Sequence, residues 1–489
     1  MKKLNLKFLI ILLLISFIAG CSIKPAKHYV GFKYFMVFDS TRQYLLGQDT
    51  TLRPELIYFW YPTKECSEDN QMKFSQYVDL ISLREDFDKT REVLDEDNYR
   101  FINAYAQFAK KNYGIGKNVT TQQILDSSVQ AFLNPVIIDE DFPLIIYAPS
   151  NSKTPAQNHM ICERLASEGY YVISVASAGV NSVKREDATE CVLAQVEDME
   201  FILDYFEHNL KIGYSSLGLL NFSAGGLAST IFQMKHSDVN AIFSMDGSNE
   251  YSYYMSISKL SDFDIKKANV PYFLVSNKDT ISIYPYYNSI KSDEKYFLRM
   301  LQLSHFGFVS FWSYFDNCDP DTIQSNYTIS YQKICDASVS FFNATLKNDK
   351  KSKSKLLGLK DQKSEYAIFE EQDNKLPVEM LNIYIQQDMD AAILKYKEST
   401  SKYNDSKLEK SLSILSWTII DNDIKSSIKL FSFIKDEFPD SWNAYYNLAY
   451  AFKMNGQLRE AKKNVLKAKE LNSSNEDIKE LIEEISEKE

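Results

Sequence analysis

Cysteine pairs and glycine-rich motifs are scarce in this sequence, and their absence excludes several kinds of chemistry. Only six of the 489 residues are Cys, and no two of them form a C-x-x-C pair. A zinc or iron–sulfur site is therefore not expected. No H-E-x-x-H segment and no glycine-rich phosphate loop occurs. The formal net charge of −11 speaks against nucleic acid as a partner. We therefore expect no metal, no other cofactor and no nucleic-acid partner.

The first residues have the pattern of a targeting signal. Three lysines precede an apolar run at 8–19 that is too short to span a bilayer stably. The run ends at Ile18-Ala19-Gly20 before Cys21, which resembles a bacterial lipobox. That resemblance implies a signal peptide at 1–20, lipidation of Cys21 and a membrane anchor; a plain secretory signal is the alternative. Ser22 then indicates the outer membrane of the cell envelope, with the protein facing the periplasm or the surface.

The remaining five cysteines, from Cys66 to Cys335, are an odd number, so at least one thiol per monomer is free if Cys21 carries lipid. Cys318 and Cys335 could form a disulfide in an oxidising envelope. None of the five lies in a context that suggests catalysis.

Composition and length predict a large folded body of more than one domain. The chain is 45% hydrophobic and 14% aromatic, which is ample for a core. Short apolar runs alternate with helical patterns and predict a mainly parallel sheet of eight strands with helices on both faces. The strands expected lie at 31–38, 56–60, 143–147, 170–175, 217–220, 240–244, 270–276 and 296–303.

Residues 64–141 interrupt this pattern and read as a helical insertion. Helices are expected at 74–83, 99–111 and 121–133. The insertion is either a lid over the functional site or a structural decoration. We expect an α/β domain at 21–346, a lysine-rich linker at 347–369 and a helical domain at 370–489.

The segment 217–230 carries the strongest catalytic signal. Its apolar run leads into Asn221-Phe222-Ser223-Ala224-Gly225-Gly226 and then a helical pattern. A strand, a tight turn and a helix with serine at the apex form a nucleophile elbow. The usual pattern is G-x-S-x-G, and Asn221 stands where its first glycine should be.

A serine hydroxyl needs a base and an orienting acid, and the sequence places candidates for both after later strands. Of five histidines, only His305 follows a late strand and precedes the closing helices. Asp246 and Asp279 each follow a strand beyond the elbow, and both are candidates for the acid. The order serine, acid, histidine is the one expected for this kind of sheet.

A tetrahedral intermediate also needs two backbone N–H donors. The residue after the nucleophile, Ala224, is one candidate, and Asn151 in the loop after the 143–147 strand is the other. Ser150-Asn151-Ser152 stands where glycines usually let the backbone turn close to a substrate, so a reshaped oxyanion hole is expected.

The C-terminal part has a repeating helical pattern. Residues 408–440 and 442–475 align at a period of about 34 residues, as in tetratricopeptide repeats. Tyr445, Leu448, Ala449, Gly456 and Ala461 lie at the spacing of that motif, and 376–396 is a possible third helix pair. Such repeats either bind a protein partner or pack on the α/β body as a stabilising tail.

Together these residues resemble the platelet-activating-factor acetylhydrolase and dienelactone hydrolase branch of the α/β-hydrolases. The resemblance covers about 34–347 and excludes much of the insertion. It rests on Asp39-Ser40-Thr41-Arg42, Trp60-Tyr61-Pro62, the apolar run at 143–147, the segment 165–170, the Ser223 elbow, Asp246 and His305.

The resemblance implies an α/β-hydrolase fold and a lipid-anchored serine esterase that acts on a small-molecule, lipid or glycan ester. Ser223 is the expected nucleophile, His305 the base and Asp246, favoured by the resemblance over Asp279, the acid. The alternative is a catalytically weak hydrolase fold that serves as a binding or scaffolding module through its helical repeats.

Overall fold

The computed structural model describes residues 27–64, 66–151, 153–181, 188–278, 283–320, 325–359, 364–369, 375–399 and 406–487. The expected signal segment at 1–20, Cys21 and Asp279 lie outside these residues. No helix in the described ranges combines the length and apolarity needed to cross a bilayer.

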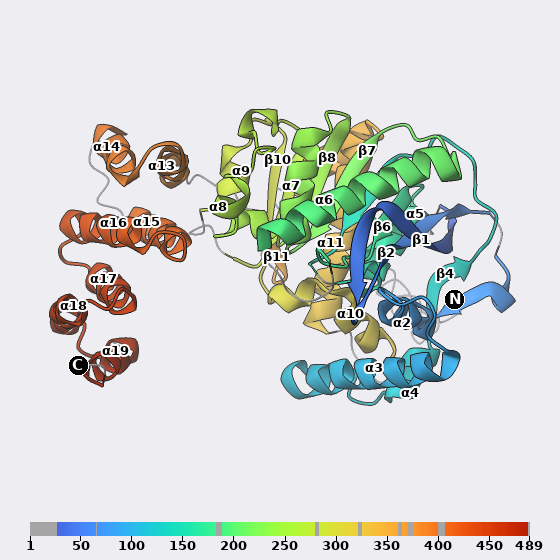
Figure 1. Ribbon diagram of the computed structural model, residues 1–489, viewed down its shortest axis with the longest axis horizontal. Helices are drawn as coiled ribbons and strands as arrows, with labels where there is room; N and C mark the ends of the chain where they lie inside the picture. Colours follow the sequence, from blue (N-terminus) through green and yellow to red (C-terminus); the bar gives the residue numbers. More distant parts are fainter. Residues whose placement is uncertain are drawn as a thin grey trace, which may run out of the picture.

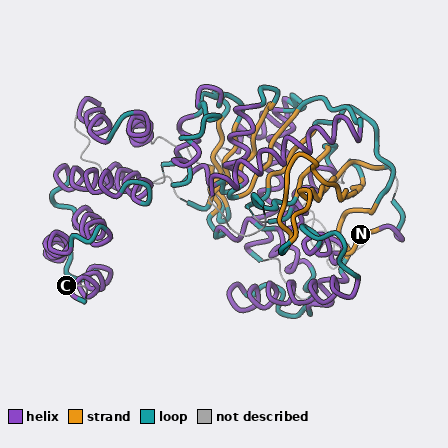
Figure 2. Tube along the Cα trace, viewed as in Figure 1, coloured by secondary structure: helices purple, strands orange, loops and turns teal. Residues whose placement is uncertain are grey.

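One mixed sheet organises the larger part of the molecule (Figures 1 and 2). Its strand order is β11-β10-β9-β8-β7-β5-β6-β2-β1-β4-β3. Neighbouring strands from β6 through β5 to β10 are parallel, while β2 and β11 pair antiparallel at either side of them. The strands are β1 Tyr29–Leu46, β2 Asp49–Thr63, β3 Gln71–Lys73, β4 Ser128–Leu133, β5 Leu144–Ala148, β6 Tyr171–Val175, β7 Leu217–Phe222, β8 Val239–Met245, β9 Tyr272–Ser276, β10 Lys295–Met300 and β11 Ala367–Phe369.

All eight expected strands are present, but the sheet has eleven because β3, β4 and β11 extend its edges. The expected helix at 121–133 was wrong in its second half. Only Thr121–Asp126 is helical (α4), and Ser128–Leu133 forms β4, where exposed and buried residues alternate. That alternation fits a strand with one buried face. β4 pairs in parallel with β1 and thereby joins the insertion to the sheet.

Helices cover both faces of the sheet because its central strands are apolar throughout. In β5, Ile145 and Tyr147 enter the core beneath α5 and α11, while Leu144 and Ile146 enter the core beneath α6 and α7. Successive side chains of a strand point to opposite faces. The helices of this body are α2 Phe74–Ser82, α3 Arg91–Tyr113, α4 Thr121–Asp126, α5 His159–Ser167, α6 Ala188–Tyr205, α7 Gly225–Lys235, α8 Tyr254–Ile257, α9 Pro285–Ser289, α10 Ser310–Asn317, α11 Asn326–Thr345 and α12 Lys350–Leu359.

The stretch expected to be a solvated linker contains regular secondary structure. It contains α12, and Ala367–Phe369 forms the edge strand β11 against β10. The pairing satisfies backbone groups at the outer edge of β10. The sheet therefore extends beyond the expected domain boundary at 346.

The C-terminal part is a row of antiparallel helix pairs at the left of Figure 1. Its helices are α13 Lys375–Gln386, α14 Met389–Ser399, α15 Ser406–Ile420, α16 Ile424–Glu437, α17 Trp442–Met454, α18 Leu458–Leu471 and α19 Glu476–Ser486. The first pair is fixed to the α/β body. The Asn382 amide on α13 accepts a hydrogen bond from Tyr254 at 3.3 Å and donates one to Ser289 at 3.1 Å.

The suggested disulfide between Cys318 and Cys335 is not formed. Cys66, Cys162, Cys191, Cys318 and Cys335 all carry free thiols, and Cys162, Cys191 and Cys335 are buried. Cys162 and Cys335 pack in the hydrophobic core on one face of the sheet.

Candidate active site

Ser223 lies at the turn between β7 and α7, in strained backbone. Its φ is 55°, in the left-handed region that residues with a side chain rarely adopt. Its N–H bonds to the Met245 carbonyl at 3.2 Å, and its carbonyl accepts the N–H groups of Gly226 and Ser248 at 2.9 and 2.8 Å. These bonds hold the turn against the end of β8 and thus keep the hydroxyl outside the sheet.

The expected serine, histidine and Asp246 meet at one edge of the sheet. Ser223 Oγ lies 3.1 Å from His305 Nε2, and His305 Nδ1 lies 2.5 Å from Asp246 Oδ2. Asp246 follows β8 directly, and His305 begins the short 3-10 turn His305–Phe308 after β10. The carboxyl ends of parallel strands share one edge, so these three distant residues converge.

Burial differs sharply among the three side chains. The Asp246 side chain is 2% exposed, whereas that of His305 is 42% exposed. The Phe222 ring stacks on the imidazole at 5.2 Å between centroids. Ser223 as a residue is 9% exposed. The acid is thus shielded from water, the serine is largely buried, and the imidazole is reachable from solvent.

Two residues that the sequence did not indicate contact the other oxygen of the acid. Asp246 Oδ1 accepts hydrogen bonds from the Tyr251 hydroxyl and, at 2.8 Å, from Ser276 Oγ. Ser276 ends β9, the strand that precedes Asp279. No motif in the sequence marks either residue.

Asn221, which replaces the usual glycine, fills a space that neighbouring glycines leave. Its Oδ1 accepts a hydrogen bond from Ser244 Oγ at 2.8 Å. A Cβ built on Gly226 or on Gly247 would lie 3.2 or 3.3 Å from this oxygen. The buried Asn221 side chain is therefore accommodated by two glycines, one in the first turn of α7 and one just after the neighbouring strand β8.

The two residues expected to donate N–H groups both belong to segments beside the elbow: Ala224 follows Ser223 in the chain, and Asn151 follows a strand that pairs with β7. Ala224 precedes α7, and Asn151 lies in the turn after β5, the strand that pairs with β7. Gln195 on α6 donates a hydrogen bond to the Pro149 carbonyl at 2.7 Å and braces that turn. The Gln195 side chain therefore helps to shape this loop, which lacks the glycines usually found there.

The insertion contacts the helix that follows the histidine turn. On α3, the Tyr105 ring stacks on Trp312 of α10 at 5.8 Å. Trp312 in turn donates its indole N–H to the Phe306 carbonyl at 2.5 Å. Figure 1 shows α3 along α10 at this end of the body. The insertion thus supports the segment that carries His305; whether it also moves as a lid stays a prediction.

Metal chemistry finds no support among the side chains that the structure describes. No group of three or more His, Cys, Asp and Glu residues within the described ranges could hold an ion.

Comparisons with known proteins identify the fold. No protein-family model matches the chain, and no curated protein matches it in sequence. Among solved structures, a ferulic acid esterase from Streptomyces cinnamoneus superposes with a TM-score of 0.50 at 14% identity. The match covers 72% of this chain and 98% of the esterase chain. At this identity the likeness shows the fold alone: an α/β-hydrolase fold followed here by an all-helical region.

Proposed function

We propose that the protein is a serine hydrolase that cleaves carboxylic esters through an acyl-enzyme. The observation that carries this proposal is the pair of contacts that link Ser223 to His305 and His305 to Asp246. A serine hydroxyl becomes nucleophilic when a neighbouring base can take its proton. The fold of the solved esterase structure supports the same reaction class.

The hydrogen bonds define the proton positions for the first step. A buried carboxylate only accepts, so His305 Nδ1 carries a proton and Nε2 presents its lone pair to Ser223. Ser223 Oγ then attacks the ester carbonyl while Nε2 takes its proton. Asp246 stabilises the resulting imidazolium, which returns the proton to the departing alcohol. Water repeats the sequence to release the acid.

In this proposal the negative oxygen of the tetrahedral intermediate is bound by the N–H groups of Ala224 and Asn151. Support comes from their places after the nucleophile and after β5. The N-terminus of α7 points toward the same side and adds a favourable partial positive charge. Asn151→Pro, which removes the donor, should lower kcat roughly 100-fold, as loss of one oxyanion donor does elsewhere.

Steady-state turnover of p-nitrophenyl acetate tests the nucleophile. We expect Ser223→Ala to abolish it while the circular dichroism spectrum stays unchanged. Ser229→Ala, at another buried serine of α7, is the matched control and should keep activity. Turnover by Ser223→Ala at the wild-type rate would refute the assignment.

We also propose the finer identity that the sequence suggests. This comprises the acetylhydrolase-like branch, a domain boundary near 346–370, tetratricopeptide-like repeats, and a lipid anchor at Cys21 in the bacterial envelope. Support for the anchor comes only from the lipobox-like start of the chain. Metabolic labelling with an alkyne palmitate, compared between wild type and Cys21→Ala, tests it: the label should be absent in the variant.

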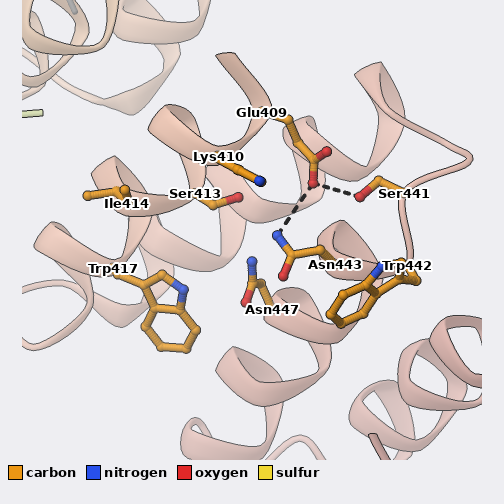
Figure 3. A pocket seen from close by; sticks show the side chains of 9 residues that line it. All are labelled: Glu409, Lys410, Ser413, Ile414, Trp417, Ser441, Trp442, Asn443 and Asn447. Atoms are coloured by element: carbon orange, nitrogen blue, oxygen red, sulfur yellow. Dashed lines mark hydrogen bonds between the residues drawn. The ribbon is translucent and has the colours of Figure 1, made fainter. Parts of the chain in front are cut away.

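A binding role for the helical region is the second candidate function. A pocket of about 560 Å³ lies between α15 and α17, lined by Glu409, Lys410, Ser413, Ile414, Trp417, Ser441, Trp442, Asn443 and Asn447 (Figure 3). On its wall the Glu409 carboxylate accepts hydrogen bonds from Ser441 at 2.6 Å and from Asn443 at 3.5 Å, so the pocket offers polar groups beside two tryptophans.

A photo-crosslinking residue at Lys410 in cells tests this second role. A discrete adduct that disappears in Trp417→Ala would support a binding module. An identical pattern in wild type and variant would refute it. If the Trp417-dependent adduct forms and the protein does not hydrolyse an ester, a binding or scaffolding role becomes the better account of the chain.

A further inference from the structure

The carboxylate oxygen of Asp246 that does not face His305 accepts two hydrogen bonds. Asp246 Oδ2 faces His305, while Oδ1 accepts from Tyr251 and Ser276. A carboxylate oxygen with two donors resists rotation of the side chain, because any turn about its bonds breaks both contacts at once. The two hydroxyls therefore fix which oxygen the imidazole meets.

The donors are themselves oriented by the surrounding backbone. The Lys278 N–H donates to Ser276 Oγ at 3.2 Å, so the serine proton is left to point at Asp246. Ser276 Oγ also lies 3.0 Å from the Tyr251 hydroxyl. The three groups form a closed triangle in which Asp246 is the common acceptor.

The carboxylate and the serine of this triangle lie away from water, and Tyr251 is half-buried. The Ser276 side chain is 0% and the Asp246 side chain 2% exposed. Hydrogen bonds in such surroundings are stronger than in solvent. Burial, and secondly the charge of Asp246, raises the pKa of Tyr251 well above its ordinary value. Tyr251 is therefore a permanent donor.

The acid and the groups that orient it come from two neighbouring strands. β8 supplies the carboxylate, and the end of β9 supplies the hydroxyl and the backbone N–H that orient it. Asp246 itself has a φ of 47° and bonds through its N–H to the Val275 carbonyl of β9 at 2.7 Å. The acid is thus anchored to β9 through both its backbone and its side chain.

We propose that Tyr251 and Ser276 are positioning residues that hold Asp246 with Oδ2 toward His305 and set how strongly the imidazole binds a proton. The catalytic meaning of this inference rests on the proposed hydrolase function. Donors on Oδ1 withdraw charge from the carboxylate, which makes it a weaker partner for the imidazolium. Removing a donor should therefore raise the proton affinity of His305.

The test is a histidine titration by NMR in the full chain, with ¹³C-labelled imidazoles. The five histidines give few signals, and His305→Asn identifies the one of interest. In Tyr251→Phe and in Ser276→Ala we expect the His305 midpoint to rise by roughly half to one pH unit. Tyr253→Phe, at an exposed tyrosine two residues away, is the matched control and should leave the midpoint unchanged.

Kinetics with p-nitrophenyl acetate provides the second readout. The acidic limb of kcat/KM should move up by the same shift in both variants. We expect kcat to fall roughly 10- to 100-fold with little change in KM, because a hydrogen bond to a charged group is lost away from the substrate. A variant that was merely destabilised would lose active protein without moving the limb.

The outcomes separate this proposal from the proposed function. If the His305 titration shifts in the two variants but the wild-type protein turns over no ester, the hydrolase function is refuted and the positioning role stands. Turnover with an unshifted titration in both variants overturns the positioning role alone. If Tyr251→Phe fails to fold, Ser276→Ala decides, because it removes one hydroxyl and leaves the Tyr251 ring in place.

Discussion

Gly225 approaches Ala148 so closely that a Cβ on residue 225 would lie 2.1 Å from the Ala148 carbonyl oxygen and 2.7 Å from that of Pro149. The start of α7 therefore passes directly over the turn after β5. No side chain fits between them, and the turn carries Asn151, one of the proposed oxyanion donors. The close approach connects the elbow to the loop that would bind the substrate carbonyl.

Gly225→Ala should therefore damage catalysis and also lower stability, because the atoms that the added Cβ would meet are backbone atoms. The added methyl must displace the 148–151 turn, which moves the Asn151 N–H away from the elbow. We expect kcat for p-nitrophenyl acetate to fall roughly 100-fold or more, the size of a lost oxyanion donor.

The control for this variant is Gly358→Ala. Gly358 lies in α12, and a Cβ there has nothing within 4 Å. Alanine at this helical position should be neutral or slightly stabilising. Equal kcat in Gly225→Ala and Gly358→Ala would show that the contact with Ala148 does not shape the site.

Asn221 and Ser244 form a buried pair whose loss should destabilise the strands that carry Ser223 and Asp246. Asn221→Ala leaves the Ser244 hydroxyl without its acceptor, at a cost of about 1–3 kcal/mol in unfolding free energy. Urea denaturation measures this. The double variant with Ser244→Ala should recover part of the loss; strict additivity of the two changes would contradict the pairing.

Much of the site follows from local sequence. The remaining parts are set by long-range packing and could not be predicted in this way. The elbow could be predicted because Ser223 and Gly225 lie within one turn. The choice of Asp246 needed the resemblance, since Asp279 also follows a strand. Tyr251 and Ser276 could not be found because they meet only when β8 and β9 pair. β4 was missed because residues 121–133 hold a short helix and a strand with no glycine or proline between them.

The β1–β2 hairpin should depend on a buried ion pair with α6. Arg53 Nη2 lies 2.6 Å from Asp198 Oδ2, and both side chains are 1% exposed. Asp198→Asn leaves Arg53 only partly paired, with Glu55 3.1 Å away, and should cost about 3–5 kcal/mol of unfolding free energy. Lys467→Ala breaks the exposed pair with Glu470 and should cost less than about 1 kcal/mol. Similar losses in the two variants would contradict a stabilising role for the Arg53–Asp198 ion pair.

Glu163 should make stability depend on pH. Burial raises its pKa to about 8, although Tyr77, 2.9 Å away, and two backbone N–H groups donate to it. In the unfolded chain, Glu163 releases this proton near the ordinary pKa of a glutamate, 4.5. Between pH 4.5 and about pH 8, Glu163 is therefore protonated in the folded state and ionised in the unfolded state. The contribution of Glu163 to stability is therefore full at low pH and is lost as pH rises toward 8.

The measurement is urea denaturation of wild type and Glu163→Gln from pH 5 to pH 9. The unfolding free energy of wild type relative to the variant should fall by up to about 1.4 kcal/mol per pH unit, then level off. Burial also raises the pKa of Glu250, to about 7, but this residue is present in both proteins and cancels. A difference that does not vary with pH would refute the assignment to Glu163.

The activated serine is tested most directly by mass-mapped labelling of the folded protein with a fluorophosphonate. We predict a single adduct, on Ser223, that is absent in Ser223→Ala and forms far more slowly in His305→Asn. No adduct on the folded wild-type protein, or labelling at an unchanged rate without the imidazole of His305, would contradict the account.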